Sequence, residues 1–201
     1  MRARMGISSS GIKIRLREIL LRDKPDEFLA ASSKATVPVL DAGGGIVIEE
    51  SLDIMLWALV QADPQNLLNP ETGSRQDMLD LIEQCEQDFK PHLDIFKYST
   101  RHNDADPVAA RDQALVFLGD LEQQLAATNF LFGTSLSLAD VAIFPFVRQF
   151  AGVDSKWFGA LDLPNLQAWL GARVTSPLFT GVMEKYQPWL VTGDEILMNA
   201  A

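Results

Sequence analysis

The sequence is short of cysteine, of positive charge and of long apolar runs. Its single cysteine, Cys85, cannot form an internal disulfide, which fits a protein kept in a reducing compartment. The net charge of −10 argues against nucleic-acid binding, because phosphate backbones attract lysine and arginine. No apolar run approaches the roughly 20 residues that a helix needs to span a bilayer. We therefore expect a cytoplasmic protein with neither nucleic acid nor membrane as a partner.

The first 22 residues depart from this acidic character. Six basic residues there face a single acid, Glu18, and residues 8–10 are all serine. The same composition is typical of an organellar transit peptide, which is one interpretation of this segment. However, Ile12, Ile14 and Leu16 alternate with basic residues, and a period of two indicates a strand with one buried face. The alternation favours a folded N-terminal segment.

Residues 1–63 mix helix and strand signals. Three glycines at 43–45 stand between two short apolar runs, which indicates a β-hairpin. The expected elements, in chain order, are a helix over 1–10 ended by Gly11, a strand over 12–20, a partly helical stretch over 23–33, strands over 37–41 and 46–48, and a helix over 50–62.

Residues 63–73 are rich in helix breakers and read as a linker, and beyond them every apolar period is helical. The expected helices are a long one whose apolar stripe runs over 78–96 with a bend at Pro91, and others that begin near Asp106-Pro107, Ser137, Pro164 and Pro177. The pattern predicts an α+β protein with a mixed domain over 1–63 and an all-helical domain over 74–201.

One helix start is unusually well marked. Ser137 is followed three residues later by Asp140, so the hydroxyl can accept from a first-turn N–H while the carboxylate reaches back to the Ser137 N–H. The carboxylate also suits the positive end of the helix. Taken alone, such a capping box is a common structural feature and carries no function.

The motifs and their order resemble the cytosolic glutathione S-transferase superfamily over nearly the whole chain. The pieces are Lys24-Pro25, residues 36–40 (TVPVL), Glu50-Ser51, residues 130–133 (FLFG) and residues 137–142 (SLADVA). The spacing from Lys24 to Val37 is most similar to that of omega-type and related bacterial members. The resemblance implies a thioredoxin-like N-terminal domain followed by an all-α domain, a homodimer, and glutathione as co-substrate.

The resemblance assigns the grip on the glutathione backbone to Val37 and Pro38. It implies a cis Val37–Pro38 bond, which a fold can enforce because the cis form costs only about 0.5–1 kcal/mol before proline. The Val37 N–H and C=O would then face outward and pair with the cysteinyl backbone of glutathione like an added strand. The alternative is a trans proline that merely starts an edge strand.

Three further residues are implied to hold the two ends of glutathione. Ser51 begins a helix, where free N–H groups and the helix dipole favour the γ-glutamyl carboxylate, and Glu50 would meet the α-ammonium. Lys24 resembles the lysine that reaches the glycine carboxylate in omega-type members. The alternatives are a helix cap for Ser51, a surface acid for Glu50 and a solvated cation for Lys24.

No catalytic residue is assigned. In this superfamily a Cys, Ser or Tyr after the first strand handles the glutathione sulfur, whereas residues 1–5 (MRARM) resemble the middle of the first helix. We therefore expect the first strand and the catalytic position upstream of Met1, in a longer natural protein. Cys85 is a poor substitute, because its apolar helix stripe and the flanking Glu83 and Glu86 raise a thiol pKa.

The remaining chemistry-bearing residues point to no additional site. His92 and His102 have no cysteine nearby, so no metal site is indicated. Phe96 and Tyr98 lie where the family's electrophile pocket tends to be, although core or interface aromatics are an equal interpretation.

The function expected of the complete protein is glutathione transfer to a small electrophile, or reduction of a disulfide substrate, through a stabilised thiolate. The alternatives are a non-catalytic binding or scaffold protein of the same fold and a glutathione-dependent isomerase or dehalogenase.

Overall fold

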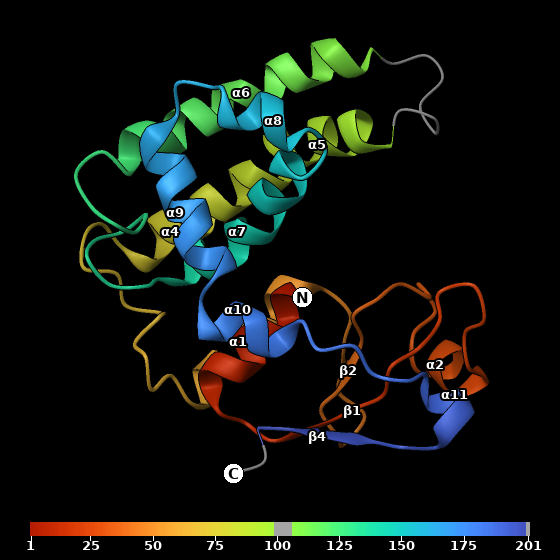
Figure 1. The fold of residues 1–201 in the computed structure, drawn as a ribbon. Helices are drawn as coiled ribbons and strands as arrows, with labels where there is room; N and C mark the ends of the chain where they lie inside the picture. The colour runs from red at the N-terminus through yellow and green to blue at the C-terminus, as the bar shows by residue number, and fades with distance from the viewer. Residues whose placement is uncertain (99–105, 200–201) are drawn as a thin grey trace. The chain divides into compact units, whose positions relative to one another are not determined.

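The structure is a computed structural model that describes residues 1–98 and 106–199. The chain divides into two compact units (Figure 1). Unit 1 contains Met1–Gln65 and the segment from Pro177 onward, and unit 2 contains Asn66–Ser176. The division near residue 65 lies inside the segment 63–73 that the sequence marks as a linker, and the residues from 177 onward belong to unit 1.

In its described residues, unit 1 combines helices with four short strands. Its elements are α1 (Arg2–Ser10), β1 (Ile14–Leu16), α2 (Asp26–Ala31), β2 (Leu40–Asp41), β3 (Val47–Ile48), α3 (Ser51–Gln61), α10 (Pro177–Val182), α11 (Trp189–Thr192) and β4 (Ile196–Met198). Helix α1 ends as predicted at Gly11, whose backbone is left-handed with a φ of 72°.

The strands of unit 1 form two separate antiparallel pairs. Strands β2 and β3 make the predicted hairpin, with Leu40 opposite Ile48. Strand β1 pairs with β4, with Ile14 opposite Met198. Two of the predicted strands are longer than the observed ones. Among the described residues, the strand predicted over 12–20 is limited to Ile14–Leu16, which pairs with β4, and the strand predicted over 37–41 is limited to Leu40–Asp41, because Pro38 has no N–H to donate.

Helices α1 and α3 form the core of unit 1. Ala3 and Ile7 of α1 pack with Ile54 and Ala58 of α3, and all four are buried. Gly6 allows this close approach, since a Cβ at that position would lie 2.9 Å from the Met55 Cα. Partly buried side chains of the strands cover the same core, among them Ile14, Leu40 and Ile48.

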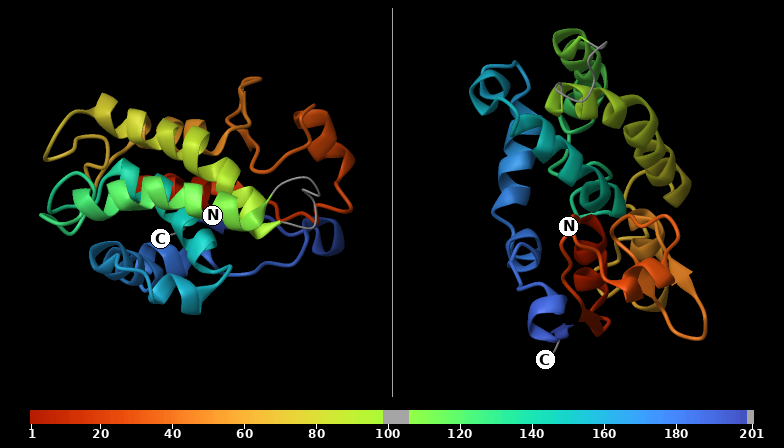
Figure 2. Two further views of the ribbon diagram at one scale, coloured as in Figure 1. Left: turned by 90° about the horizontal axis from the view of Figure 1, so that it is seen from above. Right: turned by 90° about the vertical axis from the view of Figure 1, so that its right-hand side faces the viewer.

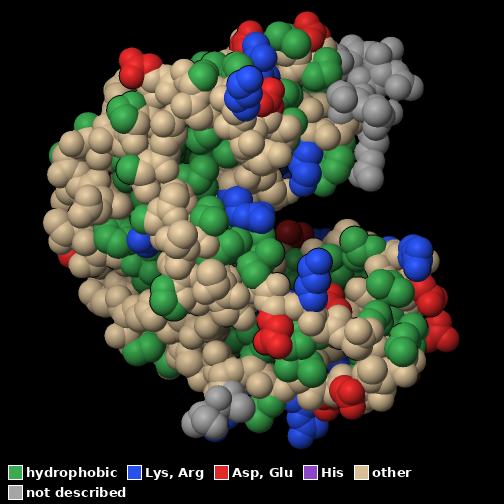
Figure 3. Space-filling model, in the orientation of Figure 1, with side chains coloured by type: hydrophobic (Ala, Val, Ile, Leu, Met, Phe, Trp, Pro, Cys, Tyr) green, Lys and Arg blue, Asp and Glu red, His purple; other side chains and the backbone are tan. Residues whose placement is uncertain are grey.

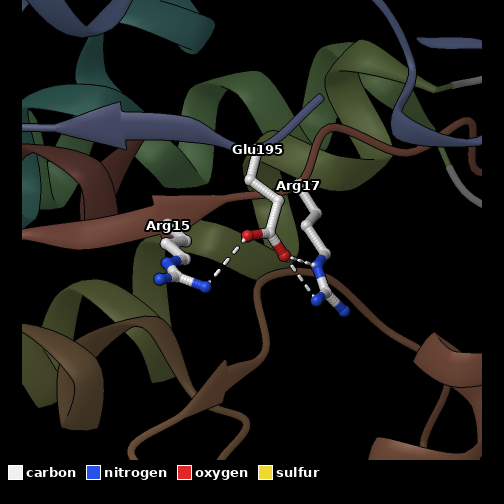
Figure 4. Close-up of polar contacts among 3 residues, drawn as sticks. All are labelled: Arg15, Arg17 and Glu195. Atoms are coloured by element: carbon white, nitrogen blue, oxygen red, sulfur yellow. Dashed lines mark hydrogen bonds and ion pairs between the residues drawn. The ribbon is translucent and has the colours of Figure 1, made fainter. Parts of the chain in front are cut away.

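The C-terminal segment is anchored to β1 by charge as well as by strand pairing. Glu195 lies between two arginines of the neighbouring strand region (Figure 4). Its Oε1 accepts from Arg17 Nε at 2.8 Å, and its Oε2 accepts from Arg15 Nη1 at 3.3 Å. The hydrogen bond from Arg17 lowers the pKa of Glu195 below its ordinary value.

Asn199 fastens the other end of β4. Its Nδ2 donates to the Ile7 carbonyl at 2.9 Å and to the Ile12 carbonyl at 2.8 Å, on either side of the end of α1. No feature of the sequence pattern had indicated β4, α11 or this anchoring.

The regular elements of unit 2 are all helices in the residues that the structure describes. Its helices are α4 (Arg75–Gln84), α5 (Lys90–Lys97), α6 (Pro107–Gln124), α7 (Leu138–Ala151), α8 (Ser155–Gly159) and α9 (Pro164–Val174), with a π turn over Cys85–Phe89. Helices α5 and α6 lie side by side (Figure 2). The π turn separates α4 from α5 just before Pro91, the residue at which the bend was predicted, and a proline lacks the N–H that would bond one turn back.

The predicted capping box between Ser137 and Asp140 is present, and the Asp140 side chain is fully buried. Asp140 Oδ2 accepts from the Ser137 N–H at 3.0 Å and from the Ser137 hydroxyl at 2.6 Å. Its Oδ1 accepts from the Leu131 N–H at 3.0 Å and from Trp169 Nε1 at 2.8 Å. Burial raises the pKa of Asp140, while these donors act in the opposite direction. One carboxylate thus joins the loop before α7 to α7 and α9.

Within the described residues, no helix combines the length and hydropathy required to cross a bilayer.

We predict that Asp140→Asn destabilises unit 2 more than Ser137→Ala does. Losing the cap costs about 1 kcal/mol, whereas an asparagine at 140 turns an N–H₂ group toward buried donors and costs roughly 2–4 kcal/mol. Urea unfolding followed by tryptophan fluorescence measures both. An Asp140→Asn effect no larger than that of Ser137→Ala would contradict the role given to this carboxylate.

We predict that Glu195→Gln speeds amide hydrogen exchange in β1 and β4 by roughly two- to fivefold at neutral pH, as expected for an exposed ion pair. Because Arg17 lowers the folded-state pKa of Glu195, its contribution is present above the ordinary carboxyl pKa and is lost as pH falls through the lowered value. The difference between the two proteins should therefore vanish in acid. Asp194→Asn, which removes the neighbouring charge, is the matched control and should leave the exchange rates unchanged.

Candidate functional site

The N-terminus of α3 is an open helix end. Glu50 is the capping residue, with an extended backbone, and its side chain makes no capping hydrogen bond. Ser51 is the first helical residue rather than the cap. The first-turn N–H groups therefore have no capping side chain, and together with the helix dipole they favour an anion.

A buried arginine reaches this helix end from α1. Arg2 is only 7% exposed, and its Nη1 donates to Ser51 Oγ at 3.3 Å. The sequence pattern did not identify Arg2, because 49 positions separate the two residues in the chain. The one local signal is Gly6 inside a helix, four residues after Arg2, since a helical glycine often marks a close approach.

Glu50 is paired with a lysine that sequence reasoning also missed. Lys34 Nζ lies 2.8 Å from Glu50 Oε1 and 3.9 Å from Glu49 Oε2. The hydrogen bond to Glu50 raises the pKa of Lys34. Both Lys34 and Glu50 are largely exposed, so the pair is weak and a competing cation can displace the lysine.

Val37 and Pro38 lie in the segment that leads into β2. The peptide bond between them is cis, and Val37 is 47% exposed. Among the described residues, neither the N–H nor the C=O of Val37 has a hydrogen-bond partner. This segment therefore offers one free backbone donor and one free acceptor.

Lys24 is half-buried just before α2. No hydrogen bond or ion pair in the described part of the chain joins it to Val37, Glu50 or Ser51. The structure thus joins Glu50 and Ser51 to Lys34 and Arg2, and it shows no direct link from Lys24 to that group.

The other candidates lie in unit 2. Cys85 is 1% exposed within the π turn. Phe96 packs its ring against those of Phe150 and Trp157, as the core interpretation expects. His102 lies outside the described residues. Within the described ranges, no group of three or more His, Cys, Asp and Glu side chains could hold a metal ion.

One face of the molecule shows how the basic side chains are distributed. On the face drawn in Figure 3, the described lysine and arginine side chains are scattered among acidic ones and form no continuous basic surface.

Models of two known domain families match two separate segments of this chain. Residues 1–66 match the model of the glutathione S-transferase N-terminal domain, and residues 101–172 match that of the glutathione S-transferase C-terminal domain. Together the two matches span well over half of the sequence.

The chain belongs to the cytosolic glutathione S-transferase superfamily. Among curated relatives, glutathione S-transferase omega-1 of Sus scrofa is 25% identical over 197 residues, covering 96% of this chain and 80% of that protein. The omega-1 protein of Mus musculus is 25% identical over 178 residues, covering 88% of this chain and 72% of its own length.

Solved structures confirm the fold. A Ser-to-Cys mutant of poplar glutathione transferase F1 has a TM-score of 0.75 at 19% identity, covering 90% of both chains. A family member from Pseudomonas fluorescens, solved with two glutathione bound, has a TM-score of 0.74 at 18% identity, covering 90% of this chain and 86% of that one. The predicted fold class, a thioredoxin-like domain followed by an all-helical glutathione S-transferase domain, is thereby confirmed.

Proposed function

We propose that the chain binds glutathione with the γ-glutamyl end at the start of α3. The observation that carries the proposal is the pairing of opposite charges at one helix end. Ser51, the open first-turn N–H groups and the buried Arg2 suit a carboxylate, and the adjacent Glu50 suits an ammonium. An α-amino acid group carries both charges on one carbon, so it matches this arrangement.

Val37 supplies the second part of the proposed grip. Its unpartnered N–H and C=O would pair with the cysteinyl backbone of glutathione in the manner of an added strand. Lys24 would reach the glycine carboxylate, as the similarity to omega-type relatives suggests. The family membership supports glutathione, and the relative from Pseudomonas fluorescens was solved with two glutathione bound.

The proposed chemistry is transfer of glutathione to a small electrophile or glutathione-dependent reduction of a disulfide. In both reactions a thiolate attacks, either an electrophilic carbon or a sulfur atom, and a leaving group departs. We propose a homodimer in the cytoplasm, in keeping with the family, and no metal.

A non-catalytic binding role is the second candidate. Cys85, the one cysteine of the sequence, is 1% exposed, so its thiol is not accessible to attack a substrate. Assays with a chloronitrobenzene electrophile and with hydroxyethyl disulfide distinguish the candidates. Turnover above the rate with glutathione alone supports an enzyme, and binding without turnover supports the second role.

The binding proposal is tested by calorimetry on the folded chain. We expect heat of binding at millimolar glutathione or below, and Ser51→Ala and Glu50→Gln each to raise the Kd roughly tenfold, because each loses a hydrogen bond to a charged group. Glu83→Gln, on α4, removes the same charge from an exposed residue outside the proposed site and should leave the Kd unchanged. No binding at millimolar glutathione by a folded sample would refute the assignment.

Substitution of Lys24 and of Lys34 should change the Kd for glutathione in opposite directions. Lys34→Gln frees Glu50 for the ligand ammonium and should lower the Kd by roughly two- to fivefold, in line with an exposed ion pair. Lys24→Gln should raise the Kd, because it removes the cation proposed for the glycine carboxylate. Calorimetry at two salt concentrations measures both. Weaker binding by Lys34→Gln would mean that Lys34 holds the ligand itself rather than competing with it.

A further inference from the structure

Helices α1 and α3 lie in contact with the same polarity. Arg2 of α1 meets Ser51 of α3, and one turn later Gly6 meets Met55. Arg2 and Gly6 are four residues apart on α1, and Ser51 and Met55 are four residues apart on α3. Residues four apart lie on the same face of a helix. The first turn of α1 is therefore held beside the first turn of α3.

The hydrogen bond between Arg2 and Ser51 has only one possible direction. A guanidinium carries donors and no acceptor, so Arg2 Nη1 must donate to Ser51 Oγ. The serine oxygen then uses a lone pair on Arg2, and its own proton remains available for an acceptor on a ligand. A carboxylate oxygen is such an acceptor, whereas an ammonium group is not.

The neighbouring arginine on α1 has a different environment. Arg4 forms an ion pair with Glu18, and its guanidinium lies over the Tyr186 ring at 5.7 Å from the centroid. Arg4 carries the same charge on the same helix, and within the described residues its ion pair and ring contact are made with Glu18 and Tyr186 rather than with α3. It therefore provides a matched control for the charge of Arg2.

We propose that Arg2 is a positioning residue for the ligand carboxylate at the start of α3. It orients the Ser51 hydroxyl as a donor and supplies a buried positive charge beside the open N–H groups. The site therefore selects ligands with a free α-carboxylate on the γ-glutamyl group. This inference rests on the proposed glutathione binding and extends it to a residue outside the matched motifs.

The test compares glutathione with an analogue whose γ-glutamyl group is replaced by γ-aminobutyryl, which lacks the α-carboxylate. Calorimetry is done on the full chain as wild type, Arg2→Gln, Arg2→Lys and Arg4→Gln. We expect Arg2→Gln to weaken glutathione binding roughly tenfold and to leave binding of the analogue unchanged. Arg4→Gln should change neither. When Arg2→Gln is combined with Ser51→Ala, the two effects on the Kd should be less than additive. Both changes remove the same hydrogen-bonded pair of side chains.

Arg2→Lys covers the case in which a glutamine at this buried position prevents folding. Lysine keeps the charge but not the fixed fork of donors, so its glutathione Kd should lie between those of wild type and Arg2→Gln, with the defect again confined to glutathione. Equal losses for both ligands, or no loss in either Arg2 variant, would overturn the inference while glutathione binding stands. A folded wild type that binds no glutathione would overturn the proposed function and this inference together.

Discussion

The contact between Gly6 and Met55 sets the geometry on which unit 1 depends. A Cβ at position 6 would lie 2.9 Å from the Met55 Cα, so a larger residue would push α1 and α3 apart. The close approach encloses the small core to which the strands add their apolar faces. It also brings Arg2 to Ser51, so the packing of two helices and the charge at the proposed binding site have one cause.

Unit 2 is organised around a buried carboxylate instead of a close helix contact. Asp140 is fully buried and accepts hydrogen bonds from Ser137, Leu131 and Trp169, which lie on three different segments. A buried charge is costly unless its partners are fixed, so this cluster favours one arrangement of those segments. The aromatic rings of Phe89 and Phe96 both pack against the ring of Phe150 elsewhere in the same unit.

Local signals in the sequence predicted much of the fold, because capping and turn chemistry act over a few residues. Gly11, Pro107 and Ser137 end or begin helices where expected. Strand lengths and β4 were not predictable in this way, since a ladder depends on a partner that is distant in the chain. The candidate site likewise contains residues that the sequence predicted and residues that it did not. A local motif located Ser51 and Glu50, whereas the contacts of Ser51 with Arg2 and of Glu50 with Lys34 exist only in the folded chain.

Glutathione binding at the start of α3 is tested most directly by amide NMR spectra of the isotopically labelled chain during a glutathione titration. The largest shifts should occur at the Val37 amide and at the first-turn amides of α3, beginning with Ser51, with a common Kd. Shifts confined to residues 66–176, or no shifts from a folded sample at saturating glutathione, would contradict binding at this site.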